Sequence, residues 1–337
     1  MGKRLVRTFI ALCLTLAAVA WYAIWAPHRF AEPKKIVVIG KGKSFAAAAE
    51  VLRDSGVISN TYLFRAVGKL FGIQTVRAGK YELESGMSTL EIMRDLKTGR
   101  SAISFFVTIP EGFRARQIAR TLRREVGIDS ARFMQLFMKA GEFGMPAKTA
   151  SLEGYLFPDT YDFAWHEDER EIIGRMVGQY KRFFCDSLMR RAKELKLSVN
   201  DVMTMASIVE GEAVKAEERP IIAGLYYNRL KKKMRLEADP TIQYAIPDGP
   251  RRLSYEDLKT ESPYNTYRKA GLPPGPINNP GRASILAALY PAKHQYLFFV
   301  ADGNGGHVFA RTYDEHMNNV RAYRRHRAEQ TGDRASR

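Results

Sequence analysis

The stretch Ser198–Ala213 has the sequence SVNDVMTMASIVEGEA, and its pattern decides how the second half of the chain is interpreted. Ser198 is followed three residues later by Asp201, which is the spacing of a helix capping box. Apolar residues then recur at helical spacing, namely Val202, Met205, Ala206, Val209 and Ala213. The stretch therefore predicts an amphipathic helix that begins after Ser198 and packs one face into a hydrophobic core.

Glu210 lies at the margin of this apolar stripe. No Lys or Arg stands three or four positions away from it, so no cation can pair with it along the helix. A carboxyl group on a half-apolar surface without a cation holds its proton more tightly, which suits a general acid near neutral pH. The alternative is an ordinary solvated helix glutamate. Glu212 has Lys215 three residues on, and we expect it to be a paired surface residue.

The composition limits the class of protein. With 337 residues the chain is long enough for two or three domains, and its 45% hydrophobic and 26% charged residues are typical of folded globular proteins. The formal net charge of +17 predicts affinity for a polyanion. Nucleic acid, anionic lipid and an acidic cell-wall polymer all satisfy this expectation, and charge alone does not choose among them.

The N-terminal residues favour a membrane. Phe9–Ala26 is a run without a charged side chain, and as a helix it would extend about 27 Å, close to the ~30 Å hydrocarbon core of a bilayer. Basic residues precede this run at Lys3, Arg4 and Arg7. Interfacial aromatic residues cluster at its far end, at Trp21, Tyr22 and Trp25.

This pattern predicts that residues 9–26 form a single-pass anchor in the cell (inner) membrane. The positive-inside rule places residues 1–8 in the cytoplasm and everything after Pro27 outside it. A cleaved signal peptide is the alternative, because Ala18-Val19-Ala20 offers a cleavage site, but the apolar run continues past that site. Export argues against a nucleic-acid partner, and the sequence has no zinc-finger spacing.

Turn and capping signals predict a small module of strands and helices over residues 36–110. The expected elements are a strand at 36–39, helices at 44–55 and 61–71, a strand at 79–84, a helix at 88–99 and a strand at 104–109. Ile39, Gly42, Ala49, Leu52 and Ile58 recur 70 positions later as Ile109, Gly112, Ala119, Leu122 and Ile128. This suggests that a strand–helix–helix unit is repeated; chance similarity between two amphipathic helices is the alternative.

Residues 111–325 are expected to form a mixed α+β domain, so the fold class is α+β. We expect helices at 167–195, 219–232 and 284–289 besides the one containing Glu210, and a hairpin from strands 296–301 and 307–310. The region 233–281 is rich in Pro and turn residues and is expected to be loop-rich, and long irregular segments of this kind often build a binding site. The basic tail 326–337 is expected to be disordered.

The available chemistry is that of carboxylates. The sequence has no H-E-x-x-H metal motif, no G-x-S-x-G or S-x-x-K nucleophile motif, and no catalytic setting for Cys13 or Cys185. We therefore expect neither a metal nor a cofactor. Acidic residues remain at Glu153, Asp159, Glu210, Glu212, Glu237 and Asp239. Aromatic residues share these segments, and rings beside carboxylates and amides suit a groove for a sugar polymer.

Six motifs in order carry a resemblance to a known family. They are LEGYLFPDTY (152–161), ASIVE (206–210), YNRL (227–230), ADPT (238–241), SPYNTY (262–267) and GLPPGPI (271–277). Together they resemble the MltG (YceG-like) family of endolytic murein transglycosylases over roughly residues 36–325. The resemblance implies a LysM-like module at 36–110 and a catalytic domain at 111–325, behind the N-terminal transmembrane helix.

The resemblance also implies a reaction. The enzyme would cleave the β-1,4 bond between N-acetylmuramic acid and N-acetylglucosamine inside glycan strands. The muramyl 6-hydroxyl would attack the anomeric carbon of its own sugar, which produces a 1,6-anhydro end without consuming water. Glu210 matches the family's catalytic glutamate, acting as general acid and then as general base. The motifs make further candidates for substrate contact, namely Glu153, Asp239, Tyr264, Asn265 and Thr266. Gly211, directly after the glutamate, departs from the family's usual basic or polar residue and leaves open how the helix presents Glu210.

Two other functions remain open at this point. One is a lysozyme-type hydrolase in which Asp239 or Glu237 assists Glu210. The other is a peptidoglycan-binding scaffold without catalysis. All three functions have peptidoglycan strands and the membrane as partners, and the leading function makes peptidoglycan synthases candidate partners as well.

Overall fold

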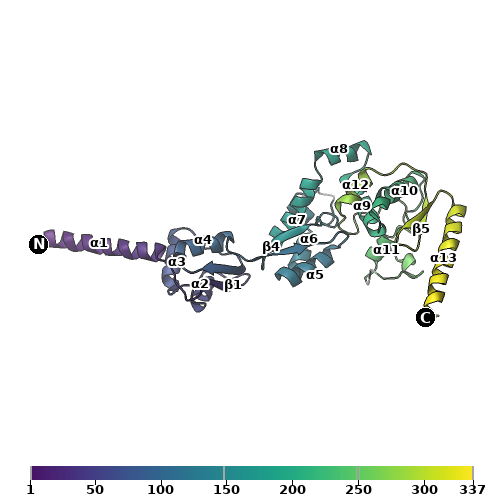
Figure 1. Ribbon diagram of the computed structural model, residues 1–337. Coiled ribbons are helices and arrows are strands. Elements are labelled where there is room, and N and C mark those ends of the chain that lie inside the picture. Colours follow the sequence, from purple (N-terminus) through teal and green to yellow (C-terminus); the bar gives the residue numbers. More distant parts are fainter. Residues whose placement is uncertain (1, 147–148, 248, 250, 336–337) are drawn as a thin grey trace. The chain divides into compact units, whose positions relative to one another are not determined.

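The computed structural model describes residues 2–146, 149–247, 249 and 251–335. The chain divides into two compact units (Figure 1). The first comprises Met1–Val107, Leu122–Asp129 and Tyr161–Ile172, and the second comprises Thr108–Thr121, Ser130–Thr160 and Ile173–Arg337. Glu210 belongs to the second unit, so the first is described only briefly.

The first unit begins with α1 (Gly2–Trp25), the predicted apolar helix. Its window Val6–Trp25 is long and apolar enough to cross a membrane, and none of that window is buried. The end of α1 is fixed to the module that follows, because His28 N–H donates to Met87 O at 2.9 Å and Gly86 N–H donates to His28 O at 2.8 Å.

The module that follows α1 has the predicted elements. They are β1 (Lys34–Ile39), α2 (Phe45–Asp54), α3 (Thr61–Leu70), β2 (Gly79–Glu84) and α4 (Thr89–Thr98). Strands β1 and β2 pair antiparallel, with Ile36 opposite Glu82 and Val38 opposite Lys80. Side-chain caps start all three helices after β1, and their buried faces close over a core that includes Leu52, Phe64 and Tyr81.

The same order of elements follows a second time. It consists of β3 (Ser104–Thr108), α5 (Ala115–Val126), α6 (Ser130–Phe137), β4 (Thr160–Ala164) and α7 (Glu169–Phe183), with a short 3₁₀ turn, η1 (Ala140–Phe143), after α6. Strands β3 and β4 form a second two-stranded sheet. This order agrees with the repeat predicted from the sequence; the LysM-like identity of residues 36–110 stays a prediction.

One predicted helix is in fact two. We expected a single helix over 167–195, but α7 ends at Phe183 and α8 (Asp186–Glu194) begins after Cys185, whose backbone is extended. Phe184 still follows the helical pattern, because its N–H donates to Tyr180 O at 2.7 Å and its buried ring stacks on Tyr180. The break therefore lies at the extended Cys185, a single residue that the helical periodicity of the sequence does not reveal.

The predicted Glu210 helix is α9 (Val199–Glu212), and it starts with the expected capping box between Ser198 and Asp201. Helices α8, α10 (Arg219–Lys231), α11 (Asp239–Ala245) and α12 (Arg282–Leu289) all contact α9, which is almost entirely buried between Val202 and Val209. Short 3₁₀ turns, η2 (Ala216–Glu218) and η3 (Asp257–Lys259), complete this part.

The remaining elements are a short helix, a hairpin and a C-terminal helix. Helix α11 lies within the loop-rich region 233–281, and Pro240 stands in its first turn, where no backbone donor is lost. The predicted hairpin is present as β5 (Phe298–Ala301) and β6 (His307–Ala310). After it comes α13 (Tyr313–Ala335), which reaches into the basic tail; the disorder expected for residues 326–337 stays a prediction.

Candidate active site

Glu210 lies near the end of α9, where its side chain is only 7% exposed. Gly281 N–H donates to Glu210 Oε2 at 3.1 Å, and Arg219 Nη2 lies 3.6 Å from Oε1. The cation that α9 itself does not offer therefore comes from the first residue of α10. Arg219 is fixed in turn, because its Nε donates to the buried Ser284 Oγ at 3.0 Å.

A second carboxyl group, Glu111, lies beside this contact. A Cβ built on Gly281 would stand 1.9 Å from Glu111 Cδ, so the carboxylate packs directly against the Gly281 Cα. The backbone N–H of Arg282 donates to Glu111. Partial burial raises the pKa of Glu111, and repulsion from Glu210 raises it further, while Arg219 and Arg282 oppose the rise.

The two carboxylates together cap helix α12. Gly281 is the N-cap of that helix and has no side chain to bond its free N–H groups. Glu210 accepts from Gly281 N–H and Glu111 accepts from Arg282 N–H, at the positive end of the helix dipole. A larger residue at position 281 would displace Glu111, which explains the glycine.

The loop that carries Glu111 is joined to the loop that carries Gly281. Gly112 N–H donates to Asn279 O at 2.9 Å, and Asn279 N–H donates to Phe113 O at 3.0 Å. Gly112 adopts φ +75°, and a Cβ there would lie 3.5 Å from Glu210 Cγ, so this turn passes close to the catalytic candidate. Sequence reasoning missed Glu111; a polar residue in a glycine turn directly after a strand was the available signal.

The predicted contact residue Glu153 lies inside the protein, 5% exposed. Its Oε1 accepts from Ala115 N–H at 3.0 Å and from Asn279 Nδ2 at 2.9 Å. Burial raises the pKa of Glu153 to about 7, against the opposing effects of these bonds and of Arg114. Its contacts are those of a residue that supports the site.

Asn279 connects Glu153 to the rest of the site. Its Oδ1 accepts from the backbone N–H groups of Gly154 and Leu156, at 3.0 and 2.9 Å, and its Nδ2 also donates to Phe113 O. Asn279 is fully buried and thus holds together the loops around residues 113, 154 and 281.

The remaining predicted contacts lie along the loop 262–267 and at the start of α11. Asn265 is fully buried and bonds Leu258 O and Thr260 O, while Thr266 accepts from Ala238 N–H at 3.0 Å. We therefore expect these two residues to hold the loops rather than to touch a glycan.

Asp239 and Tyr264 remain open to a ligand. Asp239 is exposed and accepts from the Tyr267 hydroxyl at 2.6 Å. The half-buried ring of Tyr264 lies 4.8 Å from that of Tyr244, which Arg114 covers at 5.4 Å. This aromatic pair is a platform on which a sugar ring could stack.

The structure answers the question about Gly211 and corrects the expectation for Glu212. Gly211 lies one residue before the end of α9 at Glu212, so it marks the end of the helix. A Cβ on Gly211 would stand 2.6 Å from Pro240 Cβ, so the glycine makes room for the start of α11. Glu212 is half-buried and accepts from the Tyr226 hydroxyl at 2.8 Å, while Lys215 pairs with Asp302 at 3.4 Å, so the expected Glu212–Lys215 pair is not formed. Burial raises the pKa of Glu212 to about 7.

The site thus consists of a recessed glutamate that contacts an arginine and a backbone amide, with a second carboxyl group beside it. Such a site is typical of enzymes that use carboxyl groups for acid–base catalysis. Comparison with known proteins makes this specific. The model of the YceG-like family matches residues 37–322, and the chain belongs to that family.

Similar proteins support this membership. The endolytic murein transglycosylase of Bacillus subtilis is 36% identical over 293 residues, covering 82% of this chain and 81% of the relative. The enzyme of the same name from Streptococcus pneumoniae is 29% identical over 324 residues, covering 86% of this chain and 59% of that longer relative. The crystal structure of a yceG-like protein from Listeria monocytogenes is similar at a TM-score of 0.57 and 34% identity, covering 85% of this chain and 98% of that one.

Proposed function

We propose that this chain is an endolytic peptidoglycan lytic transglycosylase, which cleaves the β-1,4 bond between N-acetylmuramic acid and N-acetylglucosamine within glycan strands. Family membership and the names of the relatives support the reaction class. The observation that carries the mechanism is the setting of Glu210, a nearly buried carboxyl group that contacts Gly281 N–H and Arg219.

The proposed mechanism needs one carboxyl group that gains and loses a proton. Protonated Glu210 donates its proton to the glycosidic oxygen while the bond from that oxygen to the muramyl C1 breaks. The resulting carboxylate then takes the proton of the muramyl 6-hydroxyl, while the oxygen of that hydroxyl forms a bond to C1. The product is a 1,6-anhydro end, Glu210 regains its proton, and no water is consumed.

Glu111 has the position to support this cycle. Partial burial and repulsion from Glu210 both raise the pKa of Glu111, so Glu111 takes up a proton more readily than a solvated carboxyl group does. Glu111 remains partly exposed, and we propose that it positions Glu210 and faces the bound strand. The residues considered as partners in a hydrolase are engaged elsewhere, Asp239 by Tyr267 and Glu237 by Arg229 at 3.3 Å.

The cellular setting is also a proposal. Helix α1 would anchor the chain in the inner membrane with residues 1–8 in the cytoplasm, and the rest would act on nascent peptidoglycan outside it, beside the synthases. The LysM-like module would bind the same glycan strands. The positive charge suits both carboxylate-bearing stem peptides and anionic lipid.

Digestion of purified sacculi by the detergent-solubilised full chain tests the function. We expect mass spectrometry of the fragments to find 1,6-anhydro ends from the wild type and none from Glu210→Gln. Glu217→Gln, a change at an exposed glutamate seven residues on, is the matched control and should cleave normally. Reducing muramyl ends would show a hydrolase instead, and binding without cleavage by the wild type would show a scaffold.

A further inference from the structure

Helix α3 exposes an apolar stripe that its own module does not cover. Thr61, Phe64, Val67 and Gly68 are its buried residues. On the opposite side Tyr62 is 79% exposed and Leu70 is 70% exposed; at 100° per residue Ala66 falls between them and Leu63 lies about 20° beyond Leu70. The helix is therefore apolar on two faces, one turned to the core and one to the outside.

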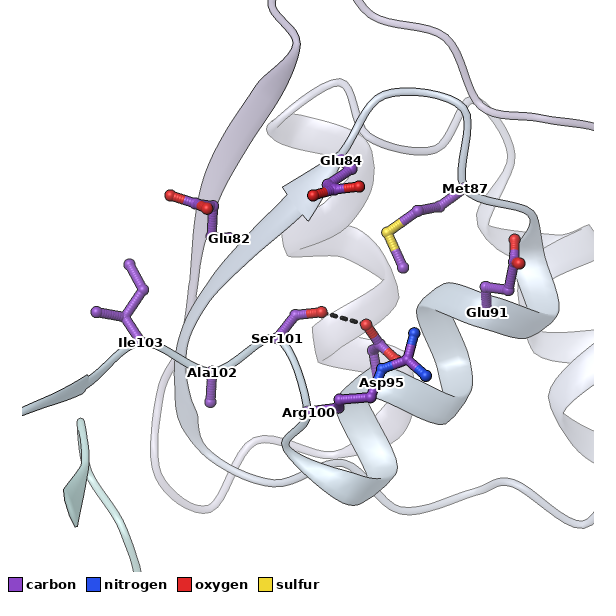
Figure 2. Close-up of a pocket in the computed structure, with 9 residues that line it drawn as sticks. All are labelled: Glu82, Glu84, Met87, Glu91, Asp95, Arg100, Ser101, Ala102 and Ile103. Atoms are coloured by element: carbon purple, nitrogen blue, oxygen red, sulfur yellow. Dashed lines mark hydrogen bonds and ion pairs between the residues drawn. The ribbon is translucent and has the colours of Figure 1, made fainter. Parts of the chain in front are cut away.

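Two cations border this outer stripe. Arg65 and Lys69 are exposed and lie one turn apart along its edge, and α3 contains no acidic residue. A hollow of about 640 Å³ on the β2 and α4 side of the module has the opposite character (Figure 2). Its lining includes Glu82, Glu84, Glu91 and Asp95, with Asp95 accepting from the Ser101 hydroxyl. The module thus has an apolar, basic helix face and a separate acidic face.

The position of α3 beside the end of α1 indicates what meets this face. Residues of α3 contact residues of α1 (Figure 1). A hollow of about 370 Å³ is lined jointly by Tyr22 and Ala26 near the end of α1 and by Leu63 of α3. Exposed Arg29 follows immediately, and Trp21 and Trp25 lie in the last turns of α1. If α1 spans a bilayer, its last turn lies at the headgroup level, and α3 lies at that level too.

We propose that the outer face of α3, formed by Tyr62, Leu63, Ala66 and Leu70 with Arg65 and Lys69, is seated in the surface of the bilayer that α1 crosses. Apolar side chains bordered by cations are the composition of helices that lie in an interface, with the chains among the acyl groups and the cations at anionic headgroups. The module is then held flat on the membrane by this contact as well as by its anchor. The proposal rests on the anchor but not on the glycan chemistry.

Spin labels on the full chain in vesicles of phosphatidylglycerol and phosphatidylcholine test this face. Both native cysteines are changed to serine, and a nitroxide is attached at Leu70→Cys or, as a control, at Val38→Cys. The label at Leu70→Cys should collide freely with oxygen, which dissolves in lipid. Its collision rate with a water-soluble nickel chelate should be several-fold lower than that of the label at Val38→Cys. Val38 is a matched control because it is 48% exposed on β1 of the same module. It lies four residues after Lys34, the first residue of β1, which is roughly 13 Å of extended strand.

A label on native Cys13 of α1, with Cys185→Ser, separates the anchor from the face. Lipid exposure at Cys13 together with water exposure at Leu70 would overturn the proposal alone, whereas water exposure at Cys13 would overturn the anchor and the proposal together. If neither oxygen nor the nickel chelate reaches the label at Leu70, or if dipolar broadening shows that labels on two copies are close, protein covers this face. Either result would also overturn the proposal. The double substitution Arg65→Glu and Lys69→Glu should increase the collision rate of the nickel chelate with the label at Leu70 several-fold on these vesicles. An unchanged rate would show that the two cations do not hold this face on the membrane.

Discussion

Replacing Gly281 with alanine should displace the Glu111 carboxylate while leaving Glu210 in place. The new Cβ would stand 1.9 Å from Glu111 Cδ and Oε1 and 2.3 Å from Oε2. Ordinary contact between such atoms needs about 3.5 Å, so the carboxylate must move by roughly 1.5 Å. The backbone at Gly281 has φ −77°, which alanine adopts without strain, and its N–H remains free to donate to Glu210.

The expected effects on folding and on activity differ in size. Stability should fall by only about 1 kcal/mol, since Glu111 is partly exposed and can turn to solvent after losing the bond to Arg282 N–H. A displacement on the order of 1 Å in a catalytic arrangement can cost about 100-fold in rate. We therefore expect kcat/KM for glycan cleavage to fall about 10- to 100-fold in a folded protein.

Release of 1,6-anhydro fragments, measured by liquid chromatography and mass spectrometry, gives the rate, and circular dichroism gives the melting temperature. Gly174→Ala is the matched control, because nothing lies within 4 Å of a Cβ at that helical position. It should cleave normally and melt slightly higher, as expected for alanine in a helix. Normal cleavage by folded Gly281→Ala would refute the role given to Glu111.

Glu111→Gln separates the charge of this residue from its position. The amide keeps the shape and can still accept from Arg282 N–H, but it no longer repels the Glu210 carboxylate. We expect the alkaline limb of the rate–pH profile to move to lower pH, since the charge of residue 111 no longer opposes ionisation beside it. An unmoved profile at the wild-type rate would contradict a role for this repulsion.

Three further predictions concern stability. Burial raises the pKa of Glu212 from 4.5 to about 7, so between these values the folded chain keeps a proton that the unfolded chain releases. The free energy of unfolding should therefore fall by roughly 3 kcal/mol as the pH rises from 5 to 8. Glu212→Gln should remove that part of the slope in urea titrations, and the exposed control Glu217→Gln should not. Gly211→Ala should lower the melting temperature by a few degrees, because contact with Pro240 at 2.6 Å outweighs the gain of about 1 kcal/mol in helix propensity; a higher melting temperature would show that α11 yields. Asn279→Ala should cost about 2–5 kcal/mol in urea unfolding, since it leaves buried backbone donors without acceptors; a loss under 1 kcal/mol would mean that water replaces the amide.

The parts of the site that could be predicted from the sequence are local ones. The capping box of α9 and the apolar stripe behind it involve residues within a few turns, and the structure contains both. The errors arose where periodicity says nothing about the local form. A single extended residue, Cys185, divides the helix expected over 167–195, and Glu212 has its partner, the Tyr226 hydroxyl, on the next helix, α10.

The partners of Glu210 were not predictable from periodicity, because they come from far along the chain. Glu111 precedes it by 99 residues, and Gly281 follows it by 71. Neither has a local pattern that indicates chemistry. Glycine in particular is chosen here for the side chain that it lacks, and only the structure shows that a carboxylate occupies that space.

The backbone around Gly281 fixes the spacing of the two carboxyl groups. On one side the loop is bonded to α9, since Ile277 N–H donates to Ser207 Oγ at 3.0 Å and Asn278 Nδ2 donates to Ser207 O at 2.8 Å. On the other side Asn279 pairs with the turn that carries Glu111. Both carboxylates then accept from consecutive N–H groups of one peptide segment, so neither can move without breaking a bond at the start of α12. The mechanism proposed for Glu210 needs this rigidity, because in it the same carboxyl group meets the glycosidic oxygen first and the 6-hydroxyl afterwards.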